Sequence, residues 1–290
     1  MMLLAAVFAL AACSPFVILN GTIGDDGFTV QSGIRYGPDV RHSLDVYTPK
    51  QRTGPVPVVV FFYGGSWRSG ERARYLFAAD ALASRGYVAI VPDYRLFPDV
   101  QFPAFVEDGA KAVRWVLDHV SDFGGDANRV YLMGHSAGAH MAAMLTLDER
   151  YLAAEGVPVK RIRGMIALAG PHAFYPSRTA SVAPIFAHLA DENAARPFVF
   201  VDGDEPPMLL LHGEDDDTVS VFNTLDLSKA VRDAGGRARH HLPGHRASQN
   251  PDRARAAFQG HRAGVARHRG IHRWPTITDG GCPMTGQDAV

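Results

Sequence analysis

Cysteine is nearly absent from the sequence, and charge of neither sign is in excess. Only Cys13 and Cys282 occur in 290 residues, at opposite ends of the chain, so neither a disulfide framework nor the ligand spacing of a zinc site is available. The formal net charge is −1, which provides no overall attraction to nucleic acid or to an anionic membrane surface. Internal repeats are also lacking. These absences exclude disulfide-rich, zinc-stabilised and repeat architectures.

The composition that remains is that of a globular protein. Hydrophobic residues make up 47% of the chain and charged residues 20%, a balance too apolar for a disordered protein. A chain of this length can bury a large core. Because no long linker divides it, we expect one domain over residues 14–245.

The N-terminal segment has the pattern of an export signal. Met1–Ala12 is a short apolar run without charge, followed by Cys13. Twelve such residues cannot span a bilayer, but they suit the hydrophobic part of a signal. Leu10-Ala11-Ala12-Cys13 resembles the bacterial lipoprotein processing box, in which the cysteine carries the lipid, although no Lys or Arg precedes the run. We expect residues 1–13 to be a lipoprotein-type signal and the protein to be lipid-anchored in the bacterial cell envelope or exported to the periplasm; a cytoplasmic protein is the alternative.

Strand patterns alternate with helix patterns along the rest of the chain. The expected strands are Phe28–Gly37, His42–Thr48, Val56–Phe62, Tyr87–Pro92, Arg129–Met133, Gly164–Gly170 and Met208–Leu211. The expected helices are Ala78–Ser84, Phe105–Val120, a stretch directly after Gly138, and Leu225–Ala234. An opening antiparallel pair followed by alternating strands and helices predicts an α/β fold, with a mostly parallel central sheet and helices on both faces.

One turn in this pattern has the sequence of a catalytic motif. The strand that ends at Met133 runs into Gly134-His135-Ser136-Ala137-Gly138, and a helix pattern follows at once. This is G-x-S-x-G in a strand–turn–helix setting, which is the context of a nucleophilic serine. The two glycines leave room for the tight turn, and the helix points its positive end at the same place. We predict that Ser136 is a nucleophile; a small-residue turn with a purely structural serine is the alternative.

A nucleophilic serine needs further groups, and the sequence offers candidates for two of them. The loop after Met208–Leu211 holds four acidic residues, Glu214 to Asp217, of which only one can orient a histidine. The tetrahedral intermediate needs N–H donors for its oxyanion. We expect them from the backbone of Ala137, directly after the serine, and from Gly64 and Gly65 after the strand Val56–Phe62.

Four motifs together resemble the bacterial carboxylesterase branch of the α/β-hydrolase superfamily, near the hormone-sensitive-lipase-like and kynurenine-formamidase-like enzymes. They are Tyr63–Trp67, Pro92–Leu96, Gly134–Gly138 and His212–Val219. The resemblance implies hydrolysis of small carboxylic esters or amides through an acyl-enzyme, without metal or cofactor. It also implies an α/β-hydrolase fold and a small-molecule ester substrate as the partner, with no nucleic acid and with membrane contact only through the N-terminal lipid anchor; the oligomeric state is not implied.

The resemblance also assigns the remaining roles. The pattern H-G-x-x-D-x-x-V places the acid at Asp216, with Asp215 and Asp217 as alternatives. The base should follow the last strand, in a segment similar to Y-P-G-x-G-H, which makes His245 the candidate although its spacing is two residues short. The last strand would carry the alternatives, His240 and His241, away from the site.

Other residues near these motifs have structural interpretations. We expect Asp93 and Arg95 to form a structural ion pair, and His135 and His140, which flank the serine turn, to be packing residues. The irregular aromatic stretch between Gly170 and Pro206 is either a substrate lid or ordinary packing.

The composition changes after Gly236, where histidine and arginine become frequent and Leu, Ile and Val become scarce. We therefore describe residues 246–290 as an atypical tail and hypothesise that a frameshift replaces the native C-terminus from about residue 240. A basic tail that binds nucleic acid or metal is the competing interpretation. The sequence thus predicts a serine carboxylesterase; a catalytically impaired protein of the same fold and an amidase or arylformamidase are the alternatives.

Overall fold

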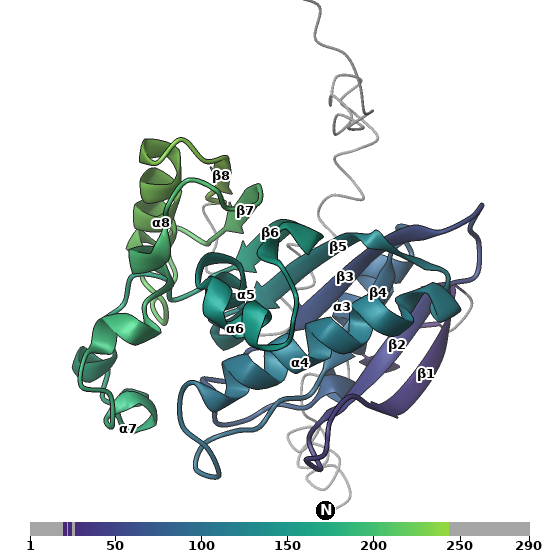
Figure 1. Ribbon diagram of the computed structural model, residues 1–290, viewed down its shortest axis with the longest axis horizontal. Helices are drawn as coiled ribbons and strands as arrows, with labels where there is room; N and C mark the ends of the chain where they lie inside the picture. Colours follow the sequence, from purple (N-terminus) through teal and green to yellow (C-terminus); the bar gives the residue numbers. More distant parts are fainter. Residues whose placement is uncertain (1–19, 22, 25–26, 244–290) are drawn as a thin grey trace, which may run out of the picture.

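A computed structural model describes residues 20–21, 23–24 and 27–243. Cys13, His245 and the tail 246–290, to which three of the predictions refer, lie outside these residues. The described chain forms an eight-stranded sheet in the order β1-β2-β4-β3-β5-β6-β7-β8 (Figure 1). Its strands are β1 (Phe28–Arg35), β2 (Ser43–Pro49), β3 (Val56–Phe62), β4 (Val88–Pro92), β5 (Gly125–His135), β6 (Ile162–Leu168), β7 (Met208–Leu211) and β8 (Ala238–His241). β2 pairs antiparallel with β1 and β4, and the other neighbours pair in parallel.

Helices connect the parallel strands. The α-helices are α3 (Leu76–Ala83), α4 (Ala104–His119), α5 (Ala137–Leu147), α6 (Glu149–Ala154), α7 (Ala183–Phe186) and α8 (Phe222–Asp233). Short 3₁₀ helices are η1 (Arg72–Tyr75), η2 (Val120–Phe123), η3 (Val159–Arg161), η4 (Pro176–Arg178), η5 (Glu192–Ala195) and η6 (Pro197–Phe200). All the expected strands and long helices are present within a few residues of their predicted bounds, whereas the sequence predicts neither α6 nor α7.

The apolar run of β3 is buried because both faces of the sheet are covered. Successive side chains of a strand point to opposite faces. Phe62 points toward α4, where a Cβ on Gly109 would lie 3.4 Å from its ring. Phe61 points the other way, with its ring centroid 5.9 Å from that of Tyr75 at the start of α3. Both phenylalanines are at most 2% exposed, and each contributes on the order of 2 kcal/mol by burial. The predicted mostly parallel sheet with helices on both faces is confirmed.

The strands end at the same level, which places the loops of one edge side by side. Phe62 of β3 is in register with Gly134 of β5. One residue further on, His135 is in register with Leu168, Leu168 with Leu211, and Leu211 with His241. The turns after these five strands therefore meet at the carboxyl edge of the sheet, where open α/β sheets hold ligands.

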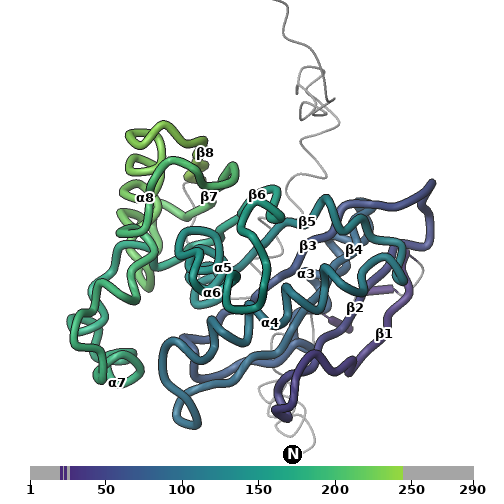
Figure 2. The backbone as a smooth tube through the Cα atoms, viewed as in Figure 1, coloured from purple at the N-terminus to yellow at the C-terminus, as the bar shows by residue number. Residues whose placement is uncertain are grey.

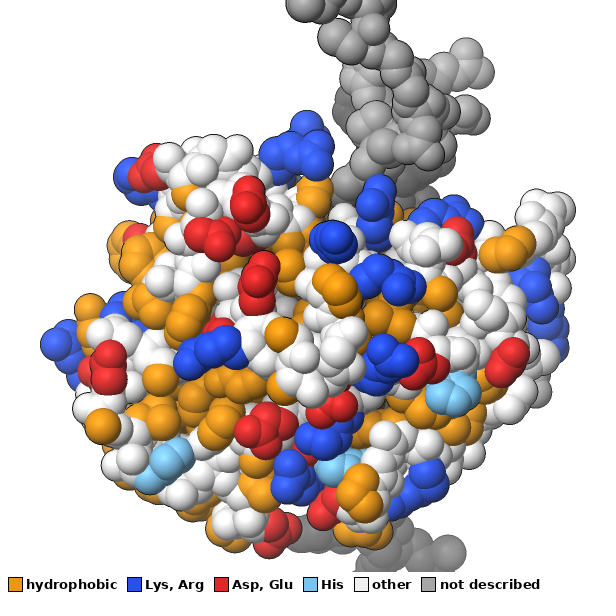
Figure 3. Space-filling model, viewed as in Figure 1, with side chains coloured by type: hydrophobic (Ala, Val, Ile, Leu, Met, Phe, Trp, Pro, Cys, Tyr) orange, Lys and Arg blue, Asp and Glu red, His pale blue; other side chains and the backbone are white. Residues whose placement is uncertain are grey.

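The described surface is mixed in character. On the face shown in Figure 3, side chains of both charge signs are interspersed with apolar ones. In the part of the chain that the structure describes, the helices are too short or too polar to cross a membrane.

Candidate active site

Ser136 lies between β5 and α5 in a strained conformation. Its φ is 51° and its ψ is −118°, a left-handed backbone that costs a non-glycine residue on the order of 1–3 kcal/mol. The turn is held by its neighbours: the Ser136 amide donates to the Leu168 carbonyl at 2.8 Å, and the His140 amide donates to the Ser136 carbonyl at 3.1 Å. The serine is half-buried at the carboxyl edge of the sheet.

The two glycines of the turn are required by close backbone contacts. A Cβ on Gly138 would lie 2.0 Å from the Phe62 carbonyl oxygen, and a Cβ on Gly134 would lie 2.2 Å from the Gly138 oxygen. Real Cβ atoms do not approach other atoms so closely. The steric role predicted for Gly134 and Gly138 is confirmed.

The loop after β3 lies against the serine. A Cβ on Gly64 would lie 3.1 Å from the Ser136 Cβ. Gly65 has a φ of 135° and faces the Ser69 carbonyl, so only glycine fits there as well. Among the described residues, the backbone amides of Gly64, Gly65 and Ala137 donate no hydrogen bond to another backbone group. The unpaired amides of Ala137 and Gly64 therefore adjoin the serine, with that of Gly65 next in the same loop, and such donors can bind an oxyanion.

Asp216 is the buried member of the acidic turn after β7. Its side chain is 2% exposed, whereas Asp215 and Asp217 are exposed. The Asp216 carboxylate accepts from the amides of Thr218 at 2.9 Å and Val219 at 3.0 Å. Burial raises the pKa of Asp216, but the hydrogen bonds from His212 and these amides outweigh it, so the net pKa lies below the ordinary value. The carboxylate is an anion held by its own turn.

His212 and Thr224 support this turn. His212 Nε2 lies 2.7 Å from the Val219 carbonyl and 3.4 Å from Asp216 Oδ2. A proton on Nε2 leaves Nδ1 to accept from the Thr224 hydroxyl at 2.8 Å. The sequence marks His212 only as part of a motif and gives no signal for Thr224, because that residue enters from α8.

The two alternative bases, His240 and His241, both lie on β8. His240 Nδ1 lies 2.9 Å from the Ser228 hydroxyl of α8, and His241 is exposed. The described chain then passes the acidic turn, since the Pro243 carbonyl accepts from the Glu214 amide at 3.3 Å. His245 follows two residues later, outside the described residues, so its assignment stays a prediction.

Two further histidines are buried beside the serine turn. His140 and His172 are 0% exposed, and burial lowers the pKa of His140 to about 4 and that of His172 to about 3. Both side chains are therefore neutral at pH 7. His140 Nε2 lies 2.8 Å from the Ala195 carbonyl, which confirms its interpretation as a packing residue.

The expected ion pair between Asp93 and Arg95 is wrong. Asp93 binds the guanidinium of Arg72 instead. Arg95 reaches the buried carboxylate of Asp108 on α4, at 2.6 Å. The chain leaves the sheet after β4, so Arg95 lies over α4, where it meets the carboxylate of Asp108.

The aromatic segment between β6 and β7, residues 171–206, is packed against the β3 loop. Figures 1 and 2 show it, with α7, projecting from the sheet on the side of α8. Its carbonyls at Ser181 and Pro184 accept from Arg68 Nε at 3.0 Å and Gln101 Nε2 at 2.8 Å. The Trp67 ring stacks on that of Phe174, with centroids 6.0 Å apart. These contacts favour the packing interpretation of this segment.

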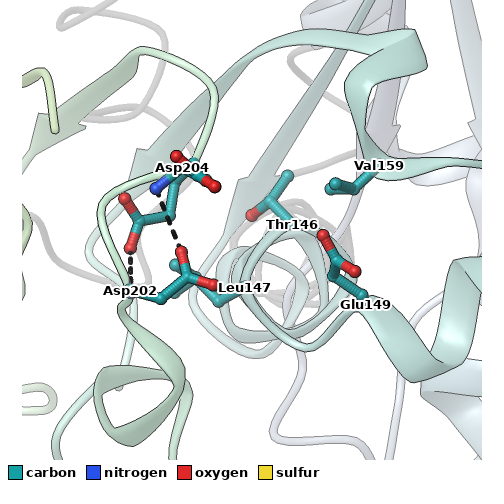
Figure 4. Close-up of a pocket in the computed structure, with 7 residues that line it drawn as sticks. Thr146, Leu147, Glu149, Val159, Asp202 and Asp204 are labelled. Atoms are coloured by element: carbon teal, nitrogen blue, oxygen red, sulfur yellow. Dashed lines mark hydrogen bonds between the residues drawn. The ribbon is translucent and has the colours of Figure 1, made fainter.

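A shallow acidic pocket lies elsewhere, between the end of α5 and the segment before β7 (Figure 4). Its lining includes Glu149, Asp202, Asp204 and Glu205. Nevertheless, no group of three or more His, Cys, Asp or Glu side chains in the described part of the chain is arranged to hold a metal ion.

Comparisons with known proteins agree with this geometry. The model of the BD-FAE family matches residues 44–231, more than half of the chain. A probable isoprenylcysteine alpha-carbonyl methylesterase of Arabidopsis thaliana is 29% identical over 260 residues, covering 80% of this chain and 54% of that protein. Esterase LipC of Mycobacterium tuberculosis is 32% identical over 219 residues, covering 69% of this chain and 54% of that protein. The chain thus spans about half the length of the curated relatives it matches.

Solved structures show the same fold. A truncated carbohydrate esterase from gut microbiota superposes with a TM-score of 0.68 at 19% identity, covering 82% of this chain and 98% of that one. Esterase 2 of Thermogutta terrifontis, phosphonylated by sarin, has a TM-score of 0.68 at 22% identity, covering 84% and 96%. The solved structures therefore share the α/β-hydrolase sheet of this chain, and the family model, which matches more than half of the chain, shows that the chain belongs to the BD-FAE family.

Proposed function

We propose that the chain is a serine carboxylesterase that cleaves small carboxylic esters through an acyl-enzyme. Ser136 is the nucleophile, His245 the general base and Asp216 the residue that orients it. The amides of Gly64, Gly65 and Ala137 form the oxyanion hole. The observation that carries the proposal is the strained Ser136 backbone, with the unpaired amides of Ala137 and Gly64 adjoining it and that of Gly65 next in the same loop.

The reaction follows from these positions. The imidazole of His245 removes the hydroxyl proton as Ser136 Oγ attacks the ester carbonyl, and the carbonyl π electrons move onto its oxygen. The amides stabilise that oxyanion, which is worth on the order of 3–4 kcal/mol per donor. When the intermediate collapses, the alcohol leaves with the proton from His245. A water molecule then repeats the sequence and releases the acid.

Two features support the choice of acid and base. Asp216 is the buried carboxylate of its turn, and its lowered pKa keeps it ionised as the imidazolium forms. The Pro243 carbonyl accepts from the Glu214 amide of the same turn, and His245 follows Pro243 by two residues in the sequence.

The relatives support an ester rather than another acyl substrate. Those cited above are named as a methylesterase, an esterase and a carbohydrate esterase. The proposed chemistry uses only protein groups and water. An amidase or arylformamidase would use the same groups, and comparison of phenyl acetate with N-formylaniline separates the two activities.

The test is turnover of p-nitrophenyl acetate by the full chain and by four variants. Ser136→Ala should lower kcat on the order of a million-fold, to background. His245→Ala and Asp216→Asn should each lower it by several orders of magnitude, whereas Asp217→Asn, the exposed neighbour, should retain wild-type activity. An inert wild-type protein would contradict the proposal and favour the catalytically impaired alternative.

A further inference from the structure

Three tyrosine rings stack directly behind the loop that carries Gly64 and Gly65. The Tyr63 ring lies between Tyr75, at a centroid distance of 5.1 Å, and Tyr94, at 4.7 Å. The three side chains come from separate segments, after β3, in η1 and after β4. Each residue is at most 7% exposed, so the stack is part of the core and holds its rings in place.

The two outer tyrosines bind the backbone of the loop. Tyr94 donates its hydroxyl hydrogen to the Tyr63 carbonyl at 2.8 Å, and Tyr75 donates to the Gly64 carbonyl at 3.2 Å. The middle hydroxyl, of Tyr63, is used differently: it donates to Asp93 Oδ1 at 2.8 Å. The Arg72 amide also donates to that carboxylate oxygen, at 2.7 Å, which fixes the central ring.

Peptide geometry connects these bonds to the proposed oxyanion hole. A trans peptide is planar, so its C=O and its N–H point in opposite directions. The peptide that holds the Tyr63 carbonyl also holds the Gly64 N–H, and the next peptide joins the Gly64 carbonyl to the Gly65 N–H. Drawing each carbonyl toward the tyrosine stack therefore turns the matching N–H away from the stack.

We propose that Tyr94 and Tyr75 are positioning residues of the oxyanion hole, which set the directions of the Gly64 and Gly65 amides respectively. This inference rests on the proposed esterase function for its kinetic consequence. Glycine peptides rotate easily, so the loop itself cannot hold two amides in one direction. The tyrosine hydroxyls supply that constraint.

Burial keeps the two hydroxyls protonated well above neutral pH. Burial raises the pKa of Tyr94 above its ordinary value, and burial raises the pKa of Tyr75 to about 12. Both therefore stay protonated and continue to donate through the neutral and alkaline range.

The kinetic test removes one hydroxyl at a time while keeping the ring stack. Tyr94→Phe should lower kcat for p-nitrophenyl acetate about 10- to 100-fold with KM unchanged, below the loss expected for deleting an oxyanion donor. Tyr75→Phe should lower it less, because its bond is longer. Each variant should lose the same factor in affinity for a trifluoromethyl ketone, whose adduct with the serine places an oxyanion in the hole. A KM that rises by as large a factor as kcat falls would overturn the proposal. An unchanged kcat in Tyr94→Phe would overturn it as well.

Tyr36→Phe is the matched control. Tyr36 is also buried and donates its hydroxyl to a backbone carbonyl, that of Asp93, but it does not touch the loop. Its kcat should equal that of the wild type. A loss as large as that of Tyr94→Phe would mean that any lost hydroxyl in this region lowers activity, and the proposal would fail.

A measurement without turnover separates this inference from the proposed function. With ¹³C-carbonyl tyrosine and ¹⁵N-glycine, the sequence has only two Tyr–Gly pairs, Tyr36-Gly37 and Tyr63-Gly64, and Tyr36→Phe removes one and assigns the other. Tyr94→Phe should shift or broaden the Gly64 amide signal, whereas Tyr36→Phe should leave it in place. An inert wild-type enzyme would contradict the esterase proposal alone; an unmoved Gly64 signal in Tyr94→Phe would contradict the positioning role.

Discussion

Gly138 shows how closely the turn around Ser136 is fitted to the neighbouring strand. Its Cα lies against the end of β3, and a methyl group there would meet the oxygens of Phe62 and of Tyr63, the residue after the strand, at 2.0 Å and 2.5 Å. The contact is between two backbone segments, so no side-chain rotation relieves it. The position of the nucleophile relative to the β3 loop thus depends on the absence of a side chain.

Gly138→Ala should therefore be strongly destabilising. We expect a loss of about 1–3 kcal/mol in the free energy of unfolding, the range for overpacking a core, measured by urea denaturation. Gly27→Ala is the control, because its Cβ would meet no atom within 4 Å and its backbone is not left-handed; it should be near neutral. A Gly138→Ala variant as stable as Gly27→Ala would mean that β3 and α5 can move apart without cost.

The residues that were predictable are those whose chemistry demands a local pattern. Ser136 and its glycines form such a pattern, since the tight turn restricts adjacent residues to small side chains. The partner of Asp93 does not, because Arg72 lies 21 residues away in sequence and only the path of the chain brings it, rather than the nearby Arg95, to this carboxylate. Tyr75 carries no local signal, as its role depends on meeting a loop that precedes it by eleven residues.

At the scale of elements, the segment between β6 and β7 is joined to the loop after β3 through aromatic packing. Phe186 of α7 is 3% exposed and lies edge-on to Trp67, with ring centroids 5.2 Å apart. It also packs against Phe102, at 5.6 Å. The Phe102 amide in turn donates to the Ile185 carbonyl at 3.2 Å. Through Phe186, the short helix α7 therefore packs this segment against the loop that holds Trp67.

Phe186→Ala should release the segment while leaving the sheet folded. Removing a buried phenylalanine side chain costs about 3–5 kcal/mol, and much of that loss should be local. Limited proteolysis should then cut within residues 171–206 before other sites. Val199→Ala, a truncation in the same segment at a side chain that is 41% exposed, should behave as the wild type. Equal protection of both variants would show that the polar contacts of Arg68 and Gln101 alone hold the segment.

The long elements were predictable and the short ones were not. β3 has a continuous apolar run, and α4 has apolar residues at helical spacing, so both follow from their own sequences. α7 has four residues, too few to show a period, and it forms because Phe186 has an aromatic cluster to enter. The acidic turn lies between these cases. Its location after β7 was predictable, but the hydrogen bond from Thr224 to His212, which supports the turn, depends on α8 folding beside it.

Considered as a whole, the molecule places neutral histidines in its core, and this makes its stability depend on pH. His140 and His172 have folded-state pKa values of about 4 and about 3, below the value near 6.5 expected in the unfolded chain. As the pH falls below 6.5, the unfolded state binds protons that the folded state does not. Stability is therefore full above pH 6.5 and decreases as the pH falls toward 4.

This pH dependence can be assigned to single residues. Each buried histidine should lower the free energy of unfolding by about 2 kcal/mol between pH 7.5 and pH 5. His172→Gln should reduce that difference by about this amount, whatever its effect at pH 7.5, in urea titrations at the two pH values. His188→Gln, at an exposed position, should leave the difference unchanged. An unaltered difference in His172→Gln would mean that His172 is protonated in the folded protein.

The level ends of the strands have a consequence for how such a protein changes over evolution. Each group of the site stands on a separate loop, and each loop begins at the same height on a shared sheet. A loop can then lengthen, shorten or be exchanged without tilting its neighbours, whereas one residue added inside a strand would displace two loops at once. Inheritance of the sheet together with variation of the loops at this edge would therefore change what the edge binds while the strand ends keep their places.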